Sequence, residues 1–469
     1  MSYNLSQFSY FWRKRNMQRE HLGSRLGFIL LSAGCAIGLG NVYKFPYITG
    51  QNGGAIFVLV YLACLLLLGI PIMAMEFAMG RAAQKSPARM YQELEPKGSK
   101  WHLHGYVCLA GNVIVLMCYS TIAGWLLQYF VDTAAGKFVG LSVAEVGKMF
   151  PAMIQNTGTM AFYTITVVVL ATIVCSFSLQ GGLERITKWM MLALLSILII
   201  LAINSCLLPG ASEGLKFYLM PDLKKFTEAG IGNVIVAAMN QSFFSLSLGI
   251  GSMAIFGSYL KKDHTLMGEA VNVVCLDTFV ALTSGLIIFP ACSAFGVEAN
   301  SGSQLLFTTL PNIFNNMALG RLWGSLFFVF MSFAALSTVF AVFENIVACV
   351  RDLTGWERKK ASLICGVVQT LLCMPCVLGF TVWSHVQILG LSIIDFEDFV
   401  VNNLLLPVGS LIFVLFCVSR YGWGWKNYVT EANTGKGPKV AGWMRFYMTY
   451  VIPCIVAFIL ICGLYNFFK

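Results

Sequence analysis

The chain has 469 residues, of which 58% are hydrophobic and 11% carry a charge. Soluble domains carry about 25% charged residues, so this composition excludes an ordinary soluble protein and indicates several membrane crossings. The net charge of +10 indicates no nucleic-acid partner, because most Lys and Arg residues lie on alternate connections between apolar runs. By the positive-inside rule, this asymmetry predicts a cytoplasmic N-terminus in a lipid bilayer.

Eleven apolar runs are long enough to cross a bilayer once tilt and internal breaks are allowed. In chain order they occupy residues 25–50, 55–80, 102–132, 160–179, 186–208, 232–259, 267–296, 321–350, 361–380, 397–419 and 446–468. The chain opens on a polar, basic stretch rather than a signal peptide. An odd number of spans then places the C-terminus outside. The sequence therefore predicts an all-α polytopic membrane protein with eleven transmembrane helices.

The first apolar run is interrupted near its middle. Between Gly34 and Asn41 it carries three glycines and small residues where an ordinary span carries Leu and Val. Glycine costs about 1 kcal/mol relative to alanine in a helix interior. In hydrocarbon, the backbone groups freed by a break need partners inside the protein or in a water-filled cavity.

The sixth run contains a second break of the same kind, between Gln241 and Gly251. Two breaks at corresponding positions are typical of secondary transporters with a binding site at the bilayer midplane. We expect two inverted five-helix repeats, each beginning with a broken helix. The predicted division is a cytoplasmic segment 1–24 with the inner gate, repeats at 25–208 and 232–420, an external loop 209–231, and an internal loop with helix 11 at 421–469.

Two connecting segments carry expectations of their own. The Gly-rich, basic segment 420–445 is expected to be a mobile connector. The external stretch 304–311 is apolar enough to fold back over the membrane domain.

Acidic residues inside the apolar runs are candidates for function, because buried charge in a membrane is costly and needs a partner. Glu76, Asp277 and Glu344 are of this kind. A sodium ion prefers oxygen ligands, which broken helices supply as carbonyls. Hydroxyl ligands could come from Ser245, Ser337 and Thr338. The alternative is that these hydroxyls only bond to backbone carbonyls within helices.

Several motifs resemble the neurotransmitter:sodium symporters. They are Arg25-Leu26-Gly27, the Gly34–Asn41 break, Gly69-Ile70-Pro71, Glu76–Arg81 and the Gln241–Gly251 break. The resemblance covers nearly the whole chain and is greatest to bacterial amino-acid transporters with the LeuT fold. It implies a bacterial inner-membrane location, because bacterial members have eleven rather than twelve spans.

The resemblance implies two sodium sites. The first would use the Ala36 carbonyl, the Asn41 side chain, Ser245, Asp277 and the carboxylate of the substrate. The second would use the carbonyls of Gly34, Ile37 and Ala334 with the hydroxyls of Ser337 and Thr338.

The resemblance also implies a substrate site between the breaks. Its residues would be Ala36, Gly38, Leu39, Gly40, Val115, Tyr119, Phe244, Ser245, Ser247, Ile250, Thr338 and Val342. The positive end of a half-helix suits a carboxylate. Amine-transporting members carry Asp at the position of Gly38, so this chain is expected to bind a substrate that brings its own carboxylate. The mostly apolar side chains favour a neutral, hydrophobic α-amino acid.

The resemblance further implies transport without chloride. Chloride-dependent members bind the anion beside the first sodium with a Tyr, a Ser and neighbouring polar groups. Tyr61, Gln241 and Ser245 match parts of that site. The position of the chloride-binding Ser is Ala281 here, and Asp277 places a fixed negative charge where those members have Asn.

Charged pairs are the candidate gates. Outside, Lys44 would pair with Asp398. Inside, Arg19 would pair with Asp352 near Tyr259, although each charge could equally be ordinary solvated surface. The position three residues after Arg19 is usually Trp in the family but is Leu22 here. By the same resemblance, Glu76 would accept hydrogen bonds from free amides of the second break.

We interpret the chain as a sodium-coupled symporter of a neutral α-amino acid, working by alternating access. One alternative is a sodium-independent or proton-coupled permease, in which Asp277 carries the proton. Another is an amino-acid sensor that binds without transporting. An enzyme is not expected, because the sequence contains neither HExxH nor GxSxG. No feature of the sequence indicates an oligomeric state.

Overall fold

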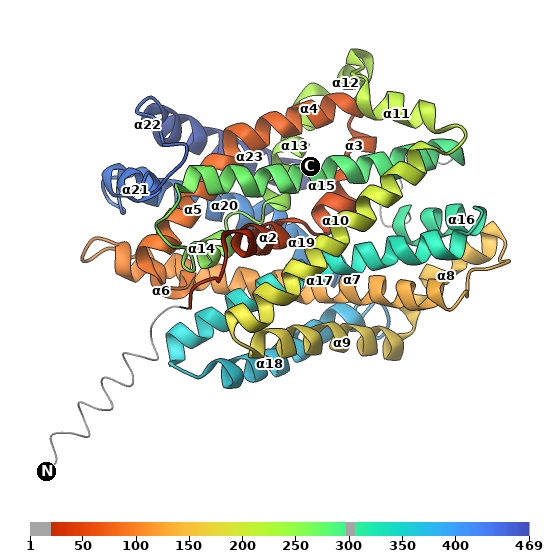
Figure 1. Ribbon diagram of the computed structural model, residues 1–469, viewed down its shortest axis with the longest axis horizontal. Coiled ribbons are helices and arrows are strands. Elements are labelled where there is room, and N and C mark those ends of the chain that lie inside the picture. The colour runs from red at the N-terminus through yellow and green to blue at the C-terminus, as the bar shows by residue number, and fades with distance from the viewer. Residues whose placement is uncertain (1–19, 297–304, 469) are drawn as a thin grey trace, which may run out of the picture.

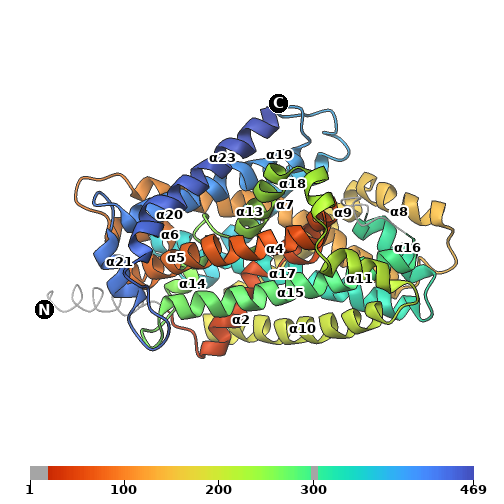
Figure 2. The ribbon, with the colours of Figure 1, turned by 90° about the horizontal axis from the view of Figure 1, so that it is seen from above.

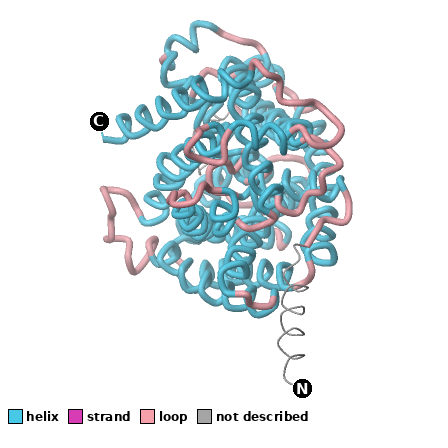
Figure 3. The backbone as a smooth tube through the Cα atoms, turned by 90° about the vertical axis from the view of Figure 1, so that its left-hand side faces the viewer, coloured by secondary structure: helices cyan, strands magenta, loops and turns pink. Residues whose placement is uncertain are grey.

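The computed structural model describes residues 20–296 and 305–468. Most helices run along the long axis of the molecule (Figure 1). The two isolated β-bridges in the described residues lie in loops. Viewed down the long axis, the helices form a bundle with loops between them (Figure 3).

The first half of the chain supplies the helices up to residue 206. They are α2 (Arg25–Ala36), α3 (Phe45–Gln51), α4 (Ala55–Cys64), α5 (Ile70–Ala83), α6 (Pro87–Leu94), α7 (His102–Ala134), α8 (Val143–Gln155), α9 (Thr157–Ser176) and α10 (Arg185–Cys206). Three π-helical segments join or extend them: η1 (Gly40–Lys44), η2 (Leu65–Gly69) and η3 (Leu179–Glu184).

The second half follows after two short helices, α11 (Ala211–Leu219) and α12 (Leu223–Ala229). Its helices are α13 (Ile231–Ser245), α14 (Ser252–Gly257), α15 (Leu266–Ala294), α16 (Leu310–Asn315), α17 (Gly320–Thr354), α18 (Arg358–Leu378), α19 (Ile393–Phe399), α20 (Leu406–Val418), α21 (Trp425–Ala432), α22 (Met444–Phe446) and α23 (Ile452–Phe468). Its π-helical segments are η4 (Leu305–Thr309), η5 (Val400–Leu405) and η6 (Tyr447–Val451).

Ten of the eleven predicted spans are recovered by length and composition. Over the described residues, nine continuous helices can cross a membrane, and the pair Arg25–Ala36 and Gly40–Gln51, bent by 56°, makes a tenth. The remaining predicted span, the sixth in chain order at 232–259, is divided into α13 and α14, with residues 246–251 between them. Both predicted breaks are therefore present.

The two breaks lie inside the bundle rather than at its surface. Helix α7 packs along α17, α2 packs against α17, and α14 packs against α5. Helix α2 also contacts α14 and α15, and Figure 2 shows α17 behind α15. The backbone groups that each break frees are thus enclosed by protein, as a membrane interior requires.

The connector at 420–445 differs from expectation. It contains α21, and Arg81 Nε lies 2.6 Å from Glu431 Oε1 on that helix. The Lys436 amide also donates to the Asp263 carbonyl at 2.9 Å. The segment is therefore not the free connector expected, because a buried ion pair joins it to α5 and backbone hydrogen bonds join it to the loop before α15.

The stretch 304–311, predicted to be external, folds back over its described residues, which begin at Leu305. Phe307 in η4 is 2% exposed. Its ring stacks on Phe150 of α8 at 4.7 Å and meets Tyr129 of α7 edge-on at 5.0 Å. This aromatic cluster covers the C-terminal end of α7.

Candidate functional site

The first break brings the backbone of residues 37–39 against α7 and α17. The Tyr119 hydroxyl accepts a 2.8 Å hydrogen bond from the Leu39 amide. A Cβ on Gly38 would lie 2.5 Å from both Thr338 Oγ1 and the Tyr119 hydroxyl. Any side chain at Gly38 would therefore displace one of these groups, which explains why glycine stands at this position.

One cluster of oxygens forms where α17 faces the end of α2. Thr338 Oγ1 lies 3.3 Å from the Gly34 carbonyl oxygen, 3.5 Å from that of Ile37 and 3.4 Å from that of Ala334. Ser337 Oγ lies 2.9 Å from the Ala334 oxygen and 3.4 Å from the Ile37 oxygen. The five residues predicted for the second sodium site are thus brought together.

The chemistry of this cluster suits a cation. Thr338 has a single O–H proton, yet the Cys35 carbonyl at 3.4 Å is a further acceptor beside it. Acceptors therefore outnumber donors around Ser337 and Thr338. Carbonyl and hydroxyl oxygens are the ligands that hard cations prefer. The alternative of hydroxyls that only bond within their own helix does not account for the contacts to Gly34 and Ile37.

A second cluster surrounds Asp277 on α15. The Asn41 amide nitrogen donates to Asp277 Oδ1 at 2.7 Å and to the Asp277 carbonyl at 3.0 Å. The Tyr61 and Ser245 hydroxyls lie 3.0 Å apart. Among the described residues, Asn41 Oδ1 and Asp277 Oδ2 are buried and have no hydrogen-bond partner.

These orphaned oxygens are the strongest sign of a cation beside Asp277. No ion pair joins Asp277 to a Lys or Arg within residues 20–296 and 305–468. A buried carboxylate without compensation costs several kcal/mol. Sodium held by Asp277 Oδ2 and Asn41 Oδ1 would remove that cost, so the donor set fits the predicted first site.

A small cavity of about 20 Å³ lies between the two breaks and α7. Nine of the twelve predicted substrate residues line it: Ala36, Gly40, Val115, Tyr119, Phe244, Ser247, Ile250, Thr338 and Val342. The other three, Gly38, Leu39 and Ser245, are not among its lining residues. Such a volume holds about one water, so the surrounding side chains must move apart to admit an amino acid.

Sequence reasoning missed two lining residues, Val401 and Leu406. Val401 lies in η5 and Leu406 at the start of α20. Both sit inside an apolar run that resembles any lipid-facing span. The π-helical segment before Pro407, of a kind frequent at functional sites, becomes visible only in the structure.

The second break is held from α5 by Glu76, as expected. The Gly249 amide donates to Glu76 Oε1 at 2.6 Å. Gly249 has φ +93°, and a Cβ there would lie 2.2 Å from the Leu406 carbonyl oxygen. Only glycine fits this backbone conformation and this close approach.

The ion pair predicted for the outer side, Lys44 with Asp398, is present and partly exposed to solvent. Lys44 Nζ lies 3.8 Å from Asp398 Oδ2, with side chains 25% and 54% exposed. The ammonium group also lies 4.0 Å from the centre of the Phe244 ring. Lys44 therefore bridges Asp398 to a residue that lines the cavity.

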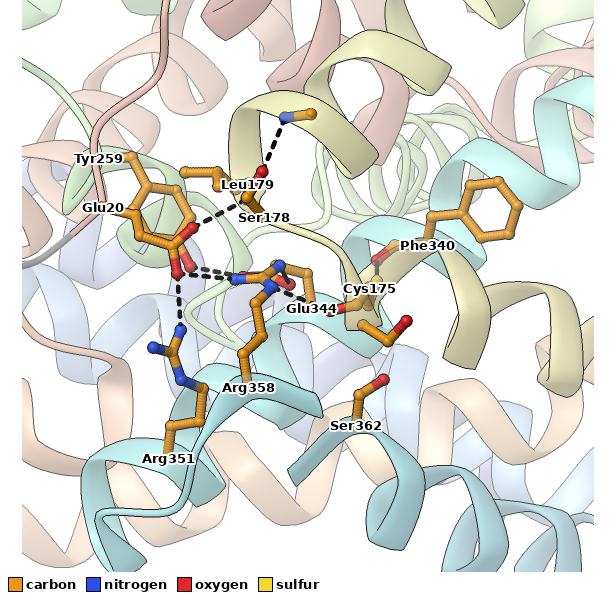
Figure 4. A network of polar contacts seen from close by, with 12 residues as sticks. Glu20, Cys175, Ser178, Leu179, Tyr259, Phe340, Glu344, Arg351, Arg358 and Ser362 are labelled. Carbon is orange, nitrogen blue, oxygen red and sulfur yellow. Dashed lines mark hydrogen bonds and ion pairs between the residues drawn. The ribbon is translucent and has the colours of Figure 1, made fainter. Parts of the chain in front are cut away.

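The predicted inner pair joins Arg19 to Asp352. Arg19 lies outside the described residues, so its pairing stays a prediction. Asp352 accepts a 2.6 Å hydrogen bond from the Ser86 amide. The described contacts on the same side centre on Glu20, whose Oε1 lies 3.1 Å from Arg351 and 3.4 Å from Arg358 (Figure 4).

Arg358 extends this network into the bundle. It pairs with Glu344 of α17 and donates to the Cys175 carbonyl at 2.9 Å. The Tyr259 hydroxyl donates to the other Glu344 oxygen at 2.8 Å. Glu344 was visible in the sequence as an acid in an apolar run, but its partner fourteen residues later was missed.

A helix bundle with two enclosed breaks, oxygen clusters at both and a cavity between them defines a secondary transporter. The family model of the sodium:neurotransmitter symporter family matches residues 19–140 and 133–469. The chain therefore belongs to this family and is a sodium-dependent, multi-pass membrane transporter rather than an enzyme.

The relatives agree in length and fold. An uncharacterised sodium-dependent transporter, YhdH of Bacillus subtilis, is 36% identical over 95% of this chain and 98% of its own. A sodium-dependent transporter of Haemophilus influenzae is 31% identical over 96% and 99%. The crystal structure of MhsT in complex with L-phenylalanine is 36% identical, with TM-score 0.85 over 95% of this chain and 100% of that one. The LeuT-type fold expected from the sequence is confirmed.

Proposed function

We propose that the protein is a symporter of sodium and a neutral, hydrophobic α-amino acid. The observation that carries this proposal is the cavity between the breaks, which is lined mainly by apolar side chains. Thr338 of one oxygen cluster lines it, as do Gly40 and Phe244, the chain neighbours of Asn41 and Ser245 in the other. Gly38 brings no carboxylate into the cavity, so an anionic group must come from the substrate. The relative MhsT was crystallised with L-phenylalanine, which supports an amino acid of this class.

The substrate carboxylate would lie beside the first sodium and the Tyr119 hydroxyl. Because that hydroxyl accepts from the Leu39 amide, its own proton is available to a carboxylate oxygen. The substrate ammonium group would meet carbonyls of the breaks near Ala36 and Phe244. The side chain of the substrate would lie among Val115, Ile250 and Val342.

Two sodium ions would support this arrangement. One would be bound by Asp277, Asn41, Ser245 and the Ala36 carbonyl together with the substrate carboxylate. The other would tie α2 to α17 through the oxygens around Thr338. Since both sites join the first break to other helices, sodium binding would favour the shape that binds substrate, which couples the two.

Chloride would not be required. Asp277 supplies the negative charge beside the first sodium, and Ala281 offers no hydroxyl to an anion. An unchanged uptake rate when gluconate is replaced by chloride is expected. A reproducible rise would contradict this part of the proposal.

We further propose a cytoplasmic N-terminus, an external C-terminus and alternating access between two inverted repeats. The Glu20 network would close the inner side, and the Lys44–Asp398 pair would close the outer side. The sodium gradient and the membrane potential, worth about 2.3 kcal/mol per charge per 100 mV, would drive accumulation.

The deciding experiment is uptake of labelled amino acids into proteoliposomes with an inward sodium gradient, against a potassium control. Accumulation of an apolar amino acid only with sodium is expected. Equal uptake in potassium would indicate a sodium-independent or proton-coupled permease. Sodium-dependent binding without any uptake would indicate a sensor.

A further inference from the structure

Asn112 lies on the face of α7 that turns toward the second break. Val115 and Tyr119, three and seven residues later on the same helical face, line the cavity. Asn112 lies one turn before Val115 and is 1% exposed. A fully buried amide beside a substrate cavity needs partners for all of its polar atoms.

The Asn112 amide finds four partners. Its Nδ2 donates to the Ile250 carbonyl at 2.8 Å and to the Cys108 carbonyl at 2.7 Å. Its Oδ1 accepts from Asn345 Nδ2 at 2.9 Å and from Ser252 Oγ at 3.2 Å. A primary amide has two donor and two acceptor positions, so protein groups fill its whole capacity. A satisfied buried network of this kind favours one packing arrangement.

Ile250 is the cavity residue that this network holds. Its backbone belongs to residues 246–251, between α13 and α14, where no regular helix fixes it. The neighbour of Asn112, Gly111, lies under the Ile250 side chain, because a Cβ there would be 3.2 Å from Ile250 Cγ2. Consecutive residues of α7 therefore contact the carbonyl and the side chain of Ile250.

We propose that Asn112 is a positioning residue that sets the size of substrate side chain the cavity accepts, by fixing Ile250 against α7. Asn345, 0% exposed on α17, orients the Asn112 amide so that its nitrogen faces Ile250. The proposal rests on the proposed function, since it assigns the cavity to an amino-acid side chain. Without the amide, Ile250 is free to recede and larger side chains gain room.

The test is the selectivity of the purified protein for large over small apolar amino acids. L-Valine and L-tryptophan would each displace labelled L-phenylalanine in saturating sodium. In Asn112→Leu, the ratio of the Kd for L-tryptophan to that for L-valine should fall about three- to tenfold, the range that one net hydrogen bond spans. In Gly111→Ala, which pushes Ile250 toward the cavity, the ratio should rise.

Two further variants separate positioning from general loss of packing. Ser252→Ala removes one donor to Asn112 Oδ1 but leaves the bond to Ile250, so the ratio should stay at the wild-type value. Ile250→Val should lower the ratio, and adding Asn112→Leu to it should lower it little more, because both act on one side chain. The proposal would be overturned if Ser252→Ala shifted the ratio as much as Asn112→Leu does. It would also be overturned if the effects of Ile250→Val and Asn112→Leu on the ratio were strictly additive.

The outcomes also separate this inference from the proposed function. Wild-type protein that binds no amino acid in sodium would contradict the function itself. Wild-type binding with an unchanged ratio in Asn112→Leu would contradict only the role of Asn112. If that variant does not yield folded protein, Asn112→Ser provides the same test, because its shorter side chain removes the donor to the Ile250 carbonyl, and an unchanged ratio there overturns the proposal.

Discussion

The carboxylate of Glu76 accepts a 2.6 Å hydrogen bond from the backbone amide of Gly249, which joins α5 to the break between α13 and α14. The break is therefore an ordered element held from its neighbours. Glu76 holds it from one side and Asn112 from another. Several measurable consequences follow from contacts of this kind.

Glu76→Ala should destabilise the protein by about 1–3 kcal/mol, because it leaves the buried Gly249 amide without an acceptor. Glu76→Gln keeps a carbonyl oxygen at that place and should lose much less. The measurement is the thermal unfolding midpoint of each purified variant, followed by sodium-dependent binding of L-phenylalanine. Equal losses in the two variants would argue against the hydrogen bond as the cause.

Gly38→Ala should weaken amino-acid binding by tenfold or more, which corresponds to about 1.4 kcal/mol. The added Cβ would lie 2.5 Å from the Tyr119 hydroxyl and from Thr338 Oγ1, so both groups must move. Titration of labelled L-phenylalanine in sodium checks this. Gly232→Ala is the matched control, because its Cβ would meet nothing within 4 Å. Unchanged affinity in Gly38→Ala would place the substrate elsewhere.

Asp277→Asn should raise the sodium concentration needed for half-maximal amino-acid binding by about tenfold or more, since a charge is removed from a buried site. The neutral amide can still contact Asn41, so the fold should persist. Thr283→Ala, on the same helix, controls for loss of a buried polar group. Undiminished sodium affinity in Asp277→Asn would refute a ligand role for the carboxylate.

The Glu20 network should make stability depend on acidic pH. Burial acts to raise the pKa of Glu20, but the charges of Arg358 and Arg351 and the Leu179 amide outweigh it, so the pKa lies below its usual 4.5. A lowered folded-state pKa means that the stabilisation is present above pH 4.5 and is lost as the pH falls through the lower value.

The unfolding midpoints of wild type and Glu20→Gln should therefore differ by a constant amount from pH 8 to pH 5. The gap should close below pH 4.5. Glu93→Gln, on the exposed side of α6, is the control and should follow wild type throughout. A gap between wild type and Glu20→Gln that widens toward low pH would contradict the assignment.

Lys44→Ala should change the substrate dissociation rate only about two- to fivefold, because an exposed ion pair contributes about 0–1 kcal/mol. Part of the effect of Lys44→Ala on the dissociation rate should remain at high salt, since the contact of Lys44 with the Phe244 ring is not a charge pair. Asp398→Ala removes the ion pair alone, and its effect should vanish in high salt. Stopped-flow measurement of both variants at two salt concentrations checks this, and identical salt dependence would contradict it.

Much of this protein could be predicted from its sequence because membrane burial constrains composition strongly. Apolar runs of bilayer length, the glycines at 34–41 and 246–251, and the rare acids Glu76 and Asp277 are all local signals. Each reflects a cost that applies wherever the residue is placed in hydrocarbon. The broken helices, the oxygen clusters and the contact of Glu76 with the second break followed from them and from the family resemblance.

Tertiary structure alone decided which distant residues meet. Glu344 could be read as needing a partner, but only the packing of α17 beside the start of α18 showed that Arg358 supplies it. Val401 and Leu406 look like ordinary lipid-facing residues until η5 turns them to the cavity. Asn112 reads as one polar residue in a long span, and its partners Ile250 and Asn345 lie more than 100 residues away. Such contacts depend on helix rotation and crossing, which local composition does not encode.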